Sequence, residues 1–142
     1  MRFVPYEYQR YCTEYIKTHP IAALFLDMGL GKTVITLSAI KDLMLETFEV
    51  SKVLIIAPLR VARDTWPAEI EKWDHLKGLD ISVIVGDVKT RIAAVHHPAM
   101  IYIVNRENIR WLVEYYEKNG MRWDFSMIVI CLLYTSDAAD EE

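Results

Sequence analysis

Seven consecutive residues, Asp27-Met28-Gly29-Leu30-Gly31-Lys32-Thr33, have the types and spacing to bind a phosphate chain. An apolar run (22–26) precedes them and an apolar-rich run (34–40) follows. A strand, a glycine turn and a helix in that order point several backbone N–H groups at one place, where the helix dipole also favours negative charge. Gly29 and Gly31 have no Cβ, so phosphate oxygens can approach the backbone.

The two polar residues that follow the glycines supply the chemistry of this loop. Lys32 can place its ammonium on the β- and γ-phosphates, and the Thr33 hydroxyl can hold magnesium. The strict pattern also has a glycine six positions before the lysine, where this chain has Leu26. The segment therefore predicts a nucleoside triphosphate site. The alternative is an ordinary glycine-containing turn whose lysine is only solvated.

Composition limits the classes of protein to consider. The chain has 142 residues, of which 53% are hydrophobic and 25% charged, as in a globular protein with a real core. No apolar run approaches the roughly 20 residues of a membrane span, and the start of the chain lacks a signal-peptide core, which favours the cytoplasm. Cys12 and Cys131 are too few and too far apart to indicate a disulfide framework or a zinc site. The net charge of −4 argues against a strongly basic nucleic-acid coat, but not against a motor that contacts phosphates locally.

Apolar runs of strand length alternate with amphipathic stretches along the chain. The pattern predicts strands at 22–26, 53–57, 81–85, 101–104 and 127–130, and helices at 6–17, 32–46, 61–76, 90–97 and 107–118. Strands that are apolar on both faces, with helices between them, indicate a mostly parallel sheet covered on both sides. With the phosphate loop after the first strand, we expect an α/β domain of the RecA-like type.

Several segments together resemble the Swi/Snf family of helicase-like DNA translocases. The phosphate loop is similar to the family's motif I, and Pro5-Tyr6-Glu7-Tyr8-Gln9 resembles its glutamine motif. Ile55-Ile56-Ala57-Pro58-Leu59-Arg60 is similar to motif Ia, and a Trp-x-x-Glu-x-x-x-Trp helix follows from Trp66 to Trp73. Ile101-Tyr102-Ile103-Val104-Asn105-Arg106-Glu107 stands where the next DNA-contacting loop is expected. The resemblance covers residues 1–130, and the compact spacing is similar to that of bacteriophage members.

The resemblance implies ATP and magnesium as cofactors and double-stranded DNA as the partner. It also implies a second RecA-like lobe, absent from this chain, that supplies an arginine finger. In this interpretation Gln9 reads the adenine edge, and Arg60, Arg63 and Arg106 contact nucleic-acid phosphates. Each has an alternative, because Gln9 could be an exposed helix residue and the arginines could be simply solvated. Two tryptophans seven residues apart share one helix face, so we expect Trp66 and Trp73 to pack in the core.

The acidic residues that hydrolysis requires are missing at the expected place. In the family Asp-Glu directly follows the strand that ends here at Ile130, but this chain has Cys131-Leu132. The acids of Asp137-Ala138-Ala139-Asp140 lie seven or more residues further on, which is too far for that role. The segment 131–141 instead resembles, residue for residue, a translated frame of a sequencing-library adapter. We therefore expect 1–130 to be part of an N-terminal RecA-like lobe and 131–142 a non-native tail, and we expect no hydrolysis by this chain.

Two other hypotheses remain open from the sequence. A P-loop kinase or a GTPase-like protein would share the phosphate loop, although the guanine-reading Asn-Lys-x-Asp is absent and the motif Ia segment would have no role. A natural nucleotide-binding module without catalytic acids would retain ATP binding and act as a sensor or scaffold.

Overall fold

A computed structural model of the chain describes residues 21–24, 32–46 and 51–131. Its centre is a five-stranded sheet with the strand order β1-β5-β2-β4-β3, and every pair of neighbours is parallel. The strands are β1 (Ile21–Leu24), β2 (Val53–Ala57), β3 (Ile81–Ile84), β4 (Ile101–Asn105) and β5 (Met127–Cys131). The predicted α/β fold with a parallel sheet is confirmed, and each of the five predicted strands is present with bounds shifted by at most two residues.

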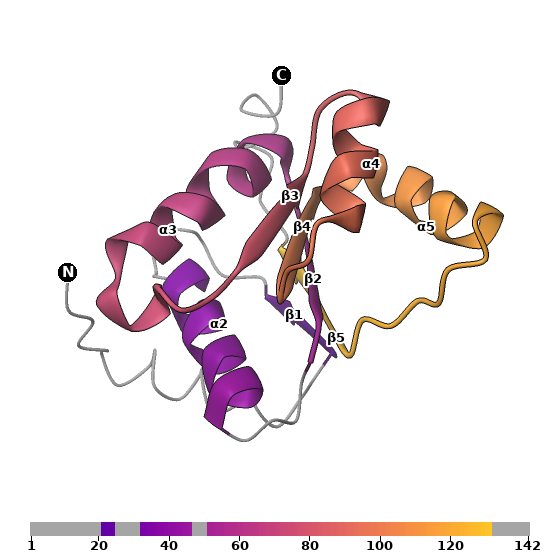
Figure 1. Cartoon of the computed structure of the whole chain (residues 1–142). Coiled ribbons are helices and arrows are strands. Elements are labelled where there is room, and N and C mark those ends of the chain that lie inside the picture. Colours follow the sequence, from indigo (N-terminus) through magenta and orange to yellow (C-terminus); the bar gives the residue numbers. More distant parts are fainter. Residues whose placement is uncertain (1–20, 25–31, 47–50, 132–142) are drawn as a thin grey trace.

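Alternate residues of the central strands pack into two separate cores. Val53 and Ile55 of β2 belong to the core on the side of helices α2 (Lys32–Lys41) and α3 (Trp66–Lys72). Leu54 belongs to the core on the side of α4 (Val88–His96) and α5 (Ile109–Lys118). Figure 1 shows these two helix pairs on opposite sides of the sheet. This arrangement explains the unbroken apolar runs of the strands, because a strand covered on both faces has no solvent side.

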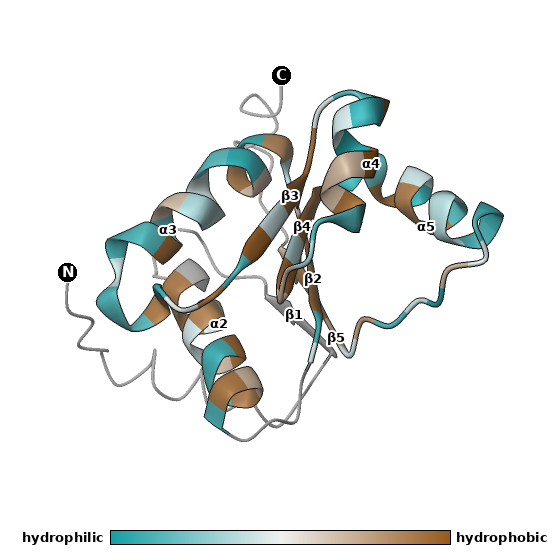
Figure 2. Cartoon of the chain, viewed as in Figure 1, coloured by the Kyte–Doolittle hydropathy of each residue, from teal (hydrophilic) through white to brown (hydrophobic). Residues whose placement is uncertain are grey.

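Helix α2 is buried on all sides over most of its length. Residues 34–40 are all buried, including the polar Thr36 and Ser38, and the helix continues through the π-helical turn Asp42–Glu46. The predicted helix 32–46 is therefore confirmed as one continuous helical segment. Figure 2 shows the apolar residues of the chain concentrated in the strands and on the helix faces that cover them.

The single helix predicted for 61–76 is wrong in its details. The segment begins as a π-helical turn, Val61–Thr65, continues as α3 and leaves the helical conformation at Trp73, with φ −103° and ψ 128°. A 3-10 turn, Asp74–Leu76, follows. Pro67 in the first turn of α3 has no N–H to donate to a carbonyl of the preceding turn, which accounts for the irregular winding before it.

Helices α4 and α5 begin differently from the prediction. Asp87 caps α4, because its carboxylate accepts a hydrogen bond from the Thr90 N–H at 2.8 Å, so the helix starts two residues before the predicted position. Before α5 the chain forms a 3-10 turn, Arg106–Asn108, where the sequence pattern predicts an α-helix already in progress. Three residues separate the start of each helix from the carboxyl end of a strand, β3 for α4 and β4 for α5.

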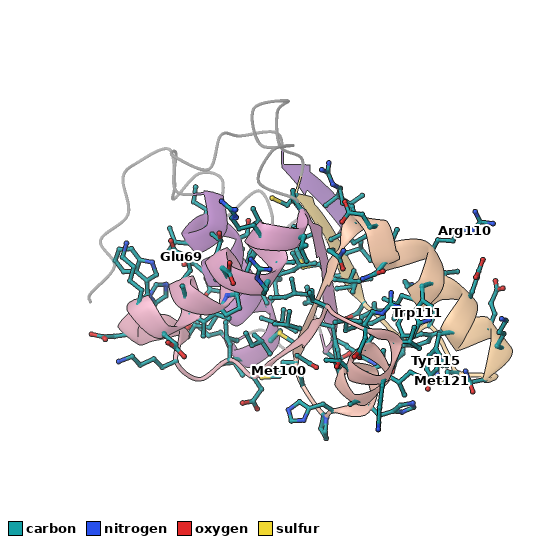
Figure 3. The ribbon with its side chains drawn as sticks, turned by 90° about the horizontal axis from the view of Figure 1, so that it is seen from above. Glu69, Met100, Arg110, Trp111, Tyr115 and Met121 are labelled. Atoms are coloured by element: carbon teal, nitrogen blue, oxygen red, sulfur yellow. The ribbon has the colours of Figure 1, made fainter. Side chains whose placement is uncertain are left out.

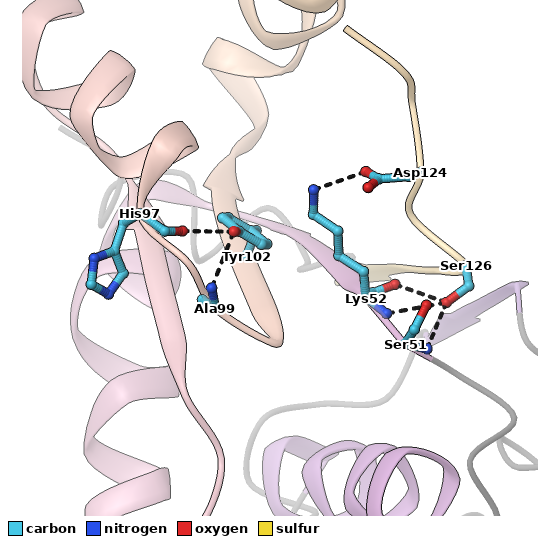
Figure 4. A network of polar contacts seen from close by, with 7 residues as sticks. All are labelled: Ser51, Lys52, His97, Ala99, Tyr102, Asp124 and Ser126. Atoms are coloured by element: carbon cyan, nitrogen blue, oxygen red, sulfur yellow. Dashed lines mark hydrogen bonds and ion pairs between the residues drawn. The ribbon is translucent and has the colours of Figure 1, made fainter.

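A group of polar residues fixes the amino ends of β2 and β5 to each other (Figure 4). The Ser126 hydroxyl accepts hydrogen bonds from the backbone N–H groups of Ser51 at 3.0 Å and Lys52 at 3.2 Å, and it donates to the Lys52 carbonyl at 3.1 Å. The Lys52 ammonium lies 2.8 Å from Asp124 and 4.9 Å from the centre of the Tyr102 ring. These contacts set the register of β5 against β2.

Candidate functional site

The carboxyl ends of the parallel strands meet at one edge of the sheet, where ligands bind in open α/β sheets. Leu24, the last residue of β1, pairs with Cys131, the last residue of β5. Ala57, the last residue of β2, pairs with Asn105, the last residue of β4. The segments that follow these four strands therefore leave the sheet at the same edge. They include the phosphate loop, the motif Ia segment and the turn that contains Arg106.

The expected phosphate-binding residues lie around the start of α2. Gln9, Met28, Gly29, Leu30 and Gly31 lie outside the described residues. Lys32 and Thr33 are the first two residues of α2, and only their backbone is described. Because β1 ends at Leu24 and α2 begins at Lys32, the seven residues between them connect the carboxyl edge of the sheet to a helix N-terminus. A helix N-terminus supplies unpaired N–H groups and a favourable dipole for an anion.

The position of the expected acidic residues can be located through β5. Cys131 ends β5 between the carboxyl ends of β1 and β2 and is 1% exposed. β5 therefore ends beside the end of β1, the strand that precedes the predicted phosphate loop in the sequence. The resemblance to the family implies an acid for magnesium directly after this strand, and the last residue of the strand, Cys131, has a buried thiol. Leu132 and the later acids Asp137 and Asp140 lie outside the described residues.

Arg60 and Arg63 follow β2 at the same edge. The chain turns into the π-helical segment where the Ala62 N–H donates to the Pro58 carbonyl at 2.8 Å. Arg63 donates two hydrogen bonds to the carboxylate of Asp64, both at 3.0 Å, and this contact lowers the pKa of Asp64. A phosphate that binds Arg63 would have to compete with Asp64. The charge of Arg60, which is also exposed, contributes to the lowered pKa of Asp64 as well.

Arg106 lies in a turn organised by hydrogen bonds among four polar side chains, to which the sequence analysis assigned no role. Asn105 at the end of β4 is 5% exposed and donates from Nδ2 to Glu107 at 2.9 Å. Asn108 donates from Nδ2 to the Asn105 side-chain oxygen at 2.7 Å, and Arg91 of α4 donates to the Asn108 side-chain oxygen. The signal in the sequence is a polar residue that ends an otherwise apolar strand, with a second asparagine three residues later.

The neighbouring Arg110 is in a different environment. Its side chain is 90% exposed, and it pairs with Glu114 one turn later at 3.1 Å. Figure 3 shows it extending away from the protein, while Trp111 on the same helix lies over the body of the fold. The Arg91 guanidinium lies 4.5 Å from the Trp111 ring centre, so it joins α4 to α5.

The two tryptophans of the Trp-x-x-Glu-x-x-x-Trp pattern are structural, as predicted. Trp66 is fully buried, and Trp73 packs against the same core. The Trp73 indole N–H donates to the carboxylate of Glu69, one turn earlier on α3. In this pattern, therefore, Trp66 packs in the core, and Trp73 is hydrogen-bonded to Glu69 at the end of α3.

A hydrogen bond links the helix after the phosphate loop to the segment after α3. Ser38 Oγ of α2 lies 2.8 Å from Nε2 of His75. Burial lowers the pKa of His75, and the nearby Lys41 lowers it further, while Asp42 and Asp74 act in the opposite direction. The neutral imidazole is therefore the form that the fold favours.

Two general observations apply to the described part of the chain. It contains no cluster of three or more histidine, cysteine or acidic side chains that could hold a metal ion. None of its helices is long and apolar enough to cross a membrane.

The sheet is parallel and covered on both faces, and a Gly-x-Gly-Lys-Thr sequence follows its first strand and ends in the first two residues of α2. These features define an α/β domain of the RecA-like class. The chain belongs to the SNF2-related domain family, whose family model matches residues 10–135. This match confirms the resemblance to the Swi/Snf family.

A phage relative aligns with most of this sequence. The chain is 38% identical over 128 residues to protein p41 of Acyrthosiphon pisum secondary endosymbiont phage 1. The matched segment is 89% of this chain and 27% of that protein, so the chain spans about a quarter of its relative's length. The relative supports a phage-type member of the family.

Proposed function

We propose that the chain is the ATP-binding lobe of a Swi/Snf-type, ATP-dependent DNA translocase. The observation that carries this proposal is the common edge formed by the ends of β1, β5, β2 and β4 in a member of the SNF2-related family. At this edge the phosphate loop, motif Ia and the Arg106 turn can act on one ATP and one DNA. Lys32 would hold the β- and γ-phosphates, Thr33 the magnesium ion, and Gln9 the adenine edge.

Binding of a fluorescent ATP analogue to the purified chain tests the nucleotide site. We expect saturable, magnesium-dependent binding that Lys32→Ala weakens by at least about tenfold, because the ammonium is lost from two phosphates. Lys89→Ala is the matched control, since Lys89 is an exposed lysine on α4, on the opposite face of the sheet. Equal binding by the two variants would contradict the site.

We propose that this chain binds ATP without hydrolysing it. The position at the end of β5 holds Cys131 in place of the acid that would organise magnesium and the attacking water. The arginine finger would come from a second RecA-like lobe outside this chain. A phosphate-release assay should give no turnover above that of Lys32→Ala, and a turnover that Lys32→Ala abolishes would overturn this proposal.

Double-stranded DNA is the proposed polymer on which the intact enzyme moves. Arg60, Arg63 and Arg106 are the proposed phosphate contacts of this lobe. Their replacement by alanine should weaken duplex binding and reduce its dependence on salt, because fewer counterions are released. The intact protein would act in the cytoplasm, or in the host cytoplasm for a phage.

A natural ATP-binding module without catalysis is the second candidate. Two observations favour this candidate. Cys131 is buried and paired with Leu24 as part of β5, and the family match extends to residue 135. The first proposal treats 131–142 as a non-native tail. Sequencing the source DNA through the codon for Ile130 with a different adapter separates the two. Asp-Glu followed by a long reading frame supports the translocase, and a confirmed Cys131 with a stop codon after Glu142 supports the module.

A further inference from the structure

A directed series of hydrogen bonds runs through the turn between β4 and α5. Arg91 donates to Asn108, Asn108 donates to Asn105, and Asn105 donates to Glu107. Each asparagine accepts with its side-chain oxygen and donates with its side-chain nitrogen. The series joins α4, the end of β4 and the 3-10 turn Arg106–Asn108.

The charged ends give the series only one direction. A guanidinium has no acceptor, and an ionised carboxylate has no donor. With Arg91 at one end and Glu107 at the other, neither asparagine amide can rotate by half a turn without placing two donors or two acceptors in contact. The buried amide of Asn105 makes such an error costly, because its groups cannot turn to water instead.

The backbone that the series holds is that of Arg106. Asn105 precedes Arg106, Glu107 follows it, and Asn108 ends the turn. The Arg91 guanidinium also lies over the Trp111 ring, so the series is anchored on the first turn of α5. Side chains on both sides of Arg106 are therefore fixed to the carboxyl edge of the sheet.

We propose that Arg91, Asn105 and Asn108 are positioning residues that hold the Arg106 backbone in one conformation, so that its guanidinium meets a phosphate of duplex DNA. This inference rests on the proposed DNA-binding function and extends it to three residues that do not themselves touch DNA. Pre-organisation of this kind lowers the conformational cost of binding.

Duplex-binding anisotropy of the purified 142-residue chain, measured over a series of salt concentrations, tests the proposal. We expect Arg106→Ala to weaken binding by about tenfold and to reduce the salt slope by about 1. Asn108→Ala, which leaves the net charge unchanged, should weaken binding by at least about threefold, and it should have no further effect when Arg106→Ala is already present. Asn119→Ala is the matched control, because Asn119 donates to the Tyr115 carbonyl at 2.8 Å at the other end of α5.

A second pair of variants keeps the test valid if Asn108→Ala does not fold. Glu107→Gln and Glu107→Ala carry the same charge at an exposed position, but only glutamine keeps an acceptor for Asn105. We expect the alanine variant to bind duplex more weakly than the glutamine variant, although both have lost the same negative charge.

The outcomes separate this inference from the proposed function. If Arg106→Ala changes nothing, the proposed DNA role of Arg106 fails, and the inference fails with it. If Arg106→Ala weakens binding and Asn108→Ala does not, only the inference fails. An equal loss from Asn108→Ala with and without Arg106, or an equal loss from Asn119→Ala, also overturns it, because the effect would then be general destabilisation.

Discussion

Replacing His75 with glutamine should remove a pH dependence from the stability of the domain. His75 lies in the 3-10 turn after α3 and shares a hydrogen bond with Ser38 of α2 at 2.8 Å. Burial, and then Lys41, lower the pKa of this imidazole from 6.5. A glutamine amide can keep the bond to Ser38 because it has both a donor and an acceptor, but it cannot take up a proton.

The sign of the effect follows from the lowered pKa of His75. Below pH 6.5 the unfolded chain binds a proton at this residue more readily than the folded chain does. The free energy of unfolding of the wild type therefore falls as the pH decreases from 6.5 through the folded-state pKa, and the contribution is complete above 6.5.

The size of the effect has an upper limit and a control. One titrating group can change the free energy of unfolding by at most about 1.4 kcal/mol per pH unit. The Ser38 hydrogen bond adds about 0.5–1.5 kcal/mol, which Ser38→Ala should remove at neutral pH. The other histidines are common to both proteins, so the difference between wild type and His75→Gln isolates this residue.

Urea unfolding, followed by tryptophan fluorescence between about pH 7.5 and about pH 5.5, measures the effect. We expect the wild type to lose more stability than His75→Gln over this range. Parallel pH profiles for the two proteins would refute the reasoning, because they would mean that His75 has the same pKa in the folded and unfolded states.

Two further predictions concern the stability of the fold. Trp66→Ala should lower the free energy of unfolding by about 3–5 kcal/mol, since it leaves a cavity where the fully buried side chain packs at the start of α3. An unchanged urea midpoint would contradict the assignment of Trp66 to the core. The hydrogen bond from Lys52 lowers the pKa of Asp124, so this pair should stabilise the fold above about pH 4 and less as the pH falls through the folded-state value. Asp124→Asn should lower the free energy of unfolding by no more than about 1 kcal/mol at neutral pH, because the carboxylate is half exposed. It should also reduce the loss of stability at acid pH, which urea titrations at several pH values would measure.

Most of the fold could be predicted from the sequence because its signals are local. Five apolar runs of strand length, separated by helical stretches, require a parallel sheet covered on both faces, and the two cores found on either side of β2 have that arrangement. The apolar residues from Val34 to Ile40 predicted a helix, and it is buried on all sides. Helix ends were less predictable, since the cap at Asp87, the break at Trp73 and the turn before Ile109 depend on individual side-chain bonds.

The candidate site divides in the same way between sequence and structure. The sequence by itself predicts the chemistry of the phosphate loop, because the proposed roles of Gly29, Gly31, Lys32 and Thr33 depend only on residue type and close spacing. Only the tertiary structure decided which distant side chains share an edge. Strand pairing brings Cys131 beside Leu24, and packing of α4 on the sheet brings Arg91 to Asn108. Contacts between residues so far apart in sequence depend on how the elements assemble, and no local pattern encodes them.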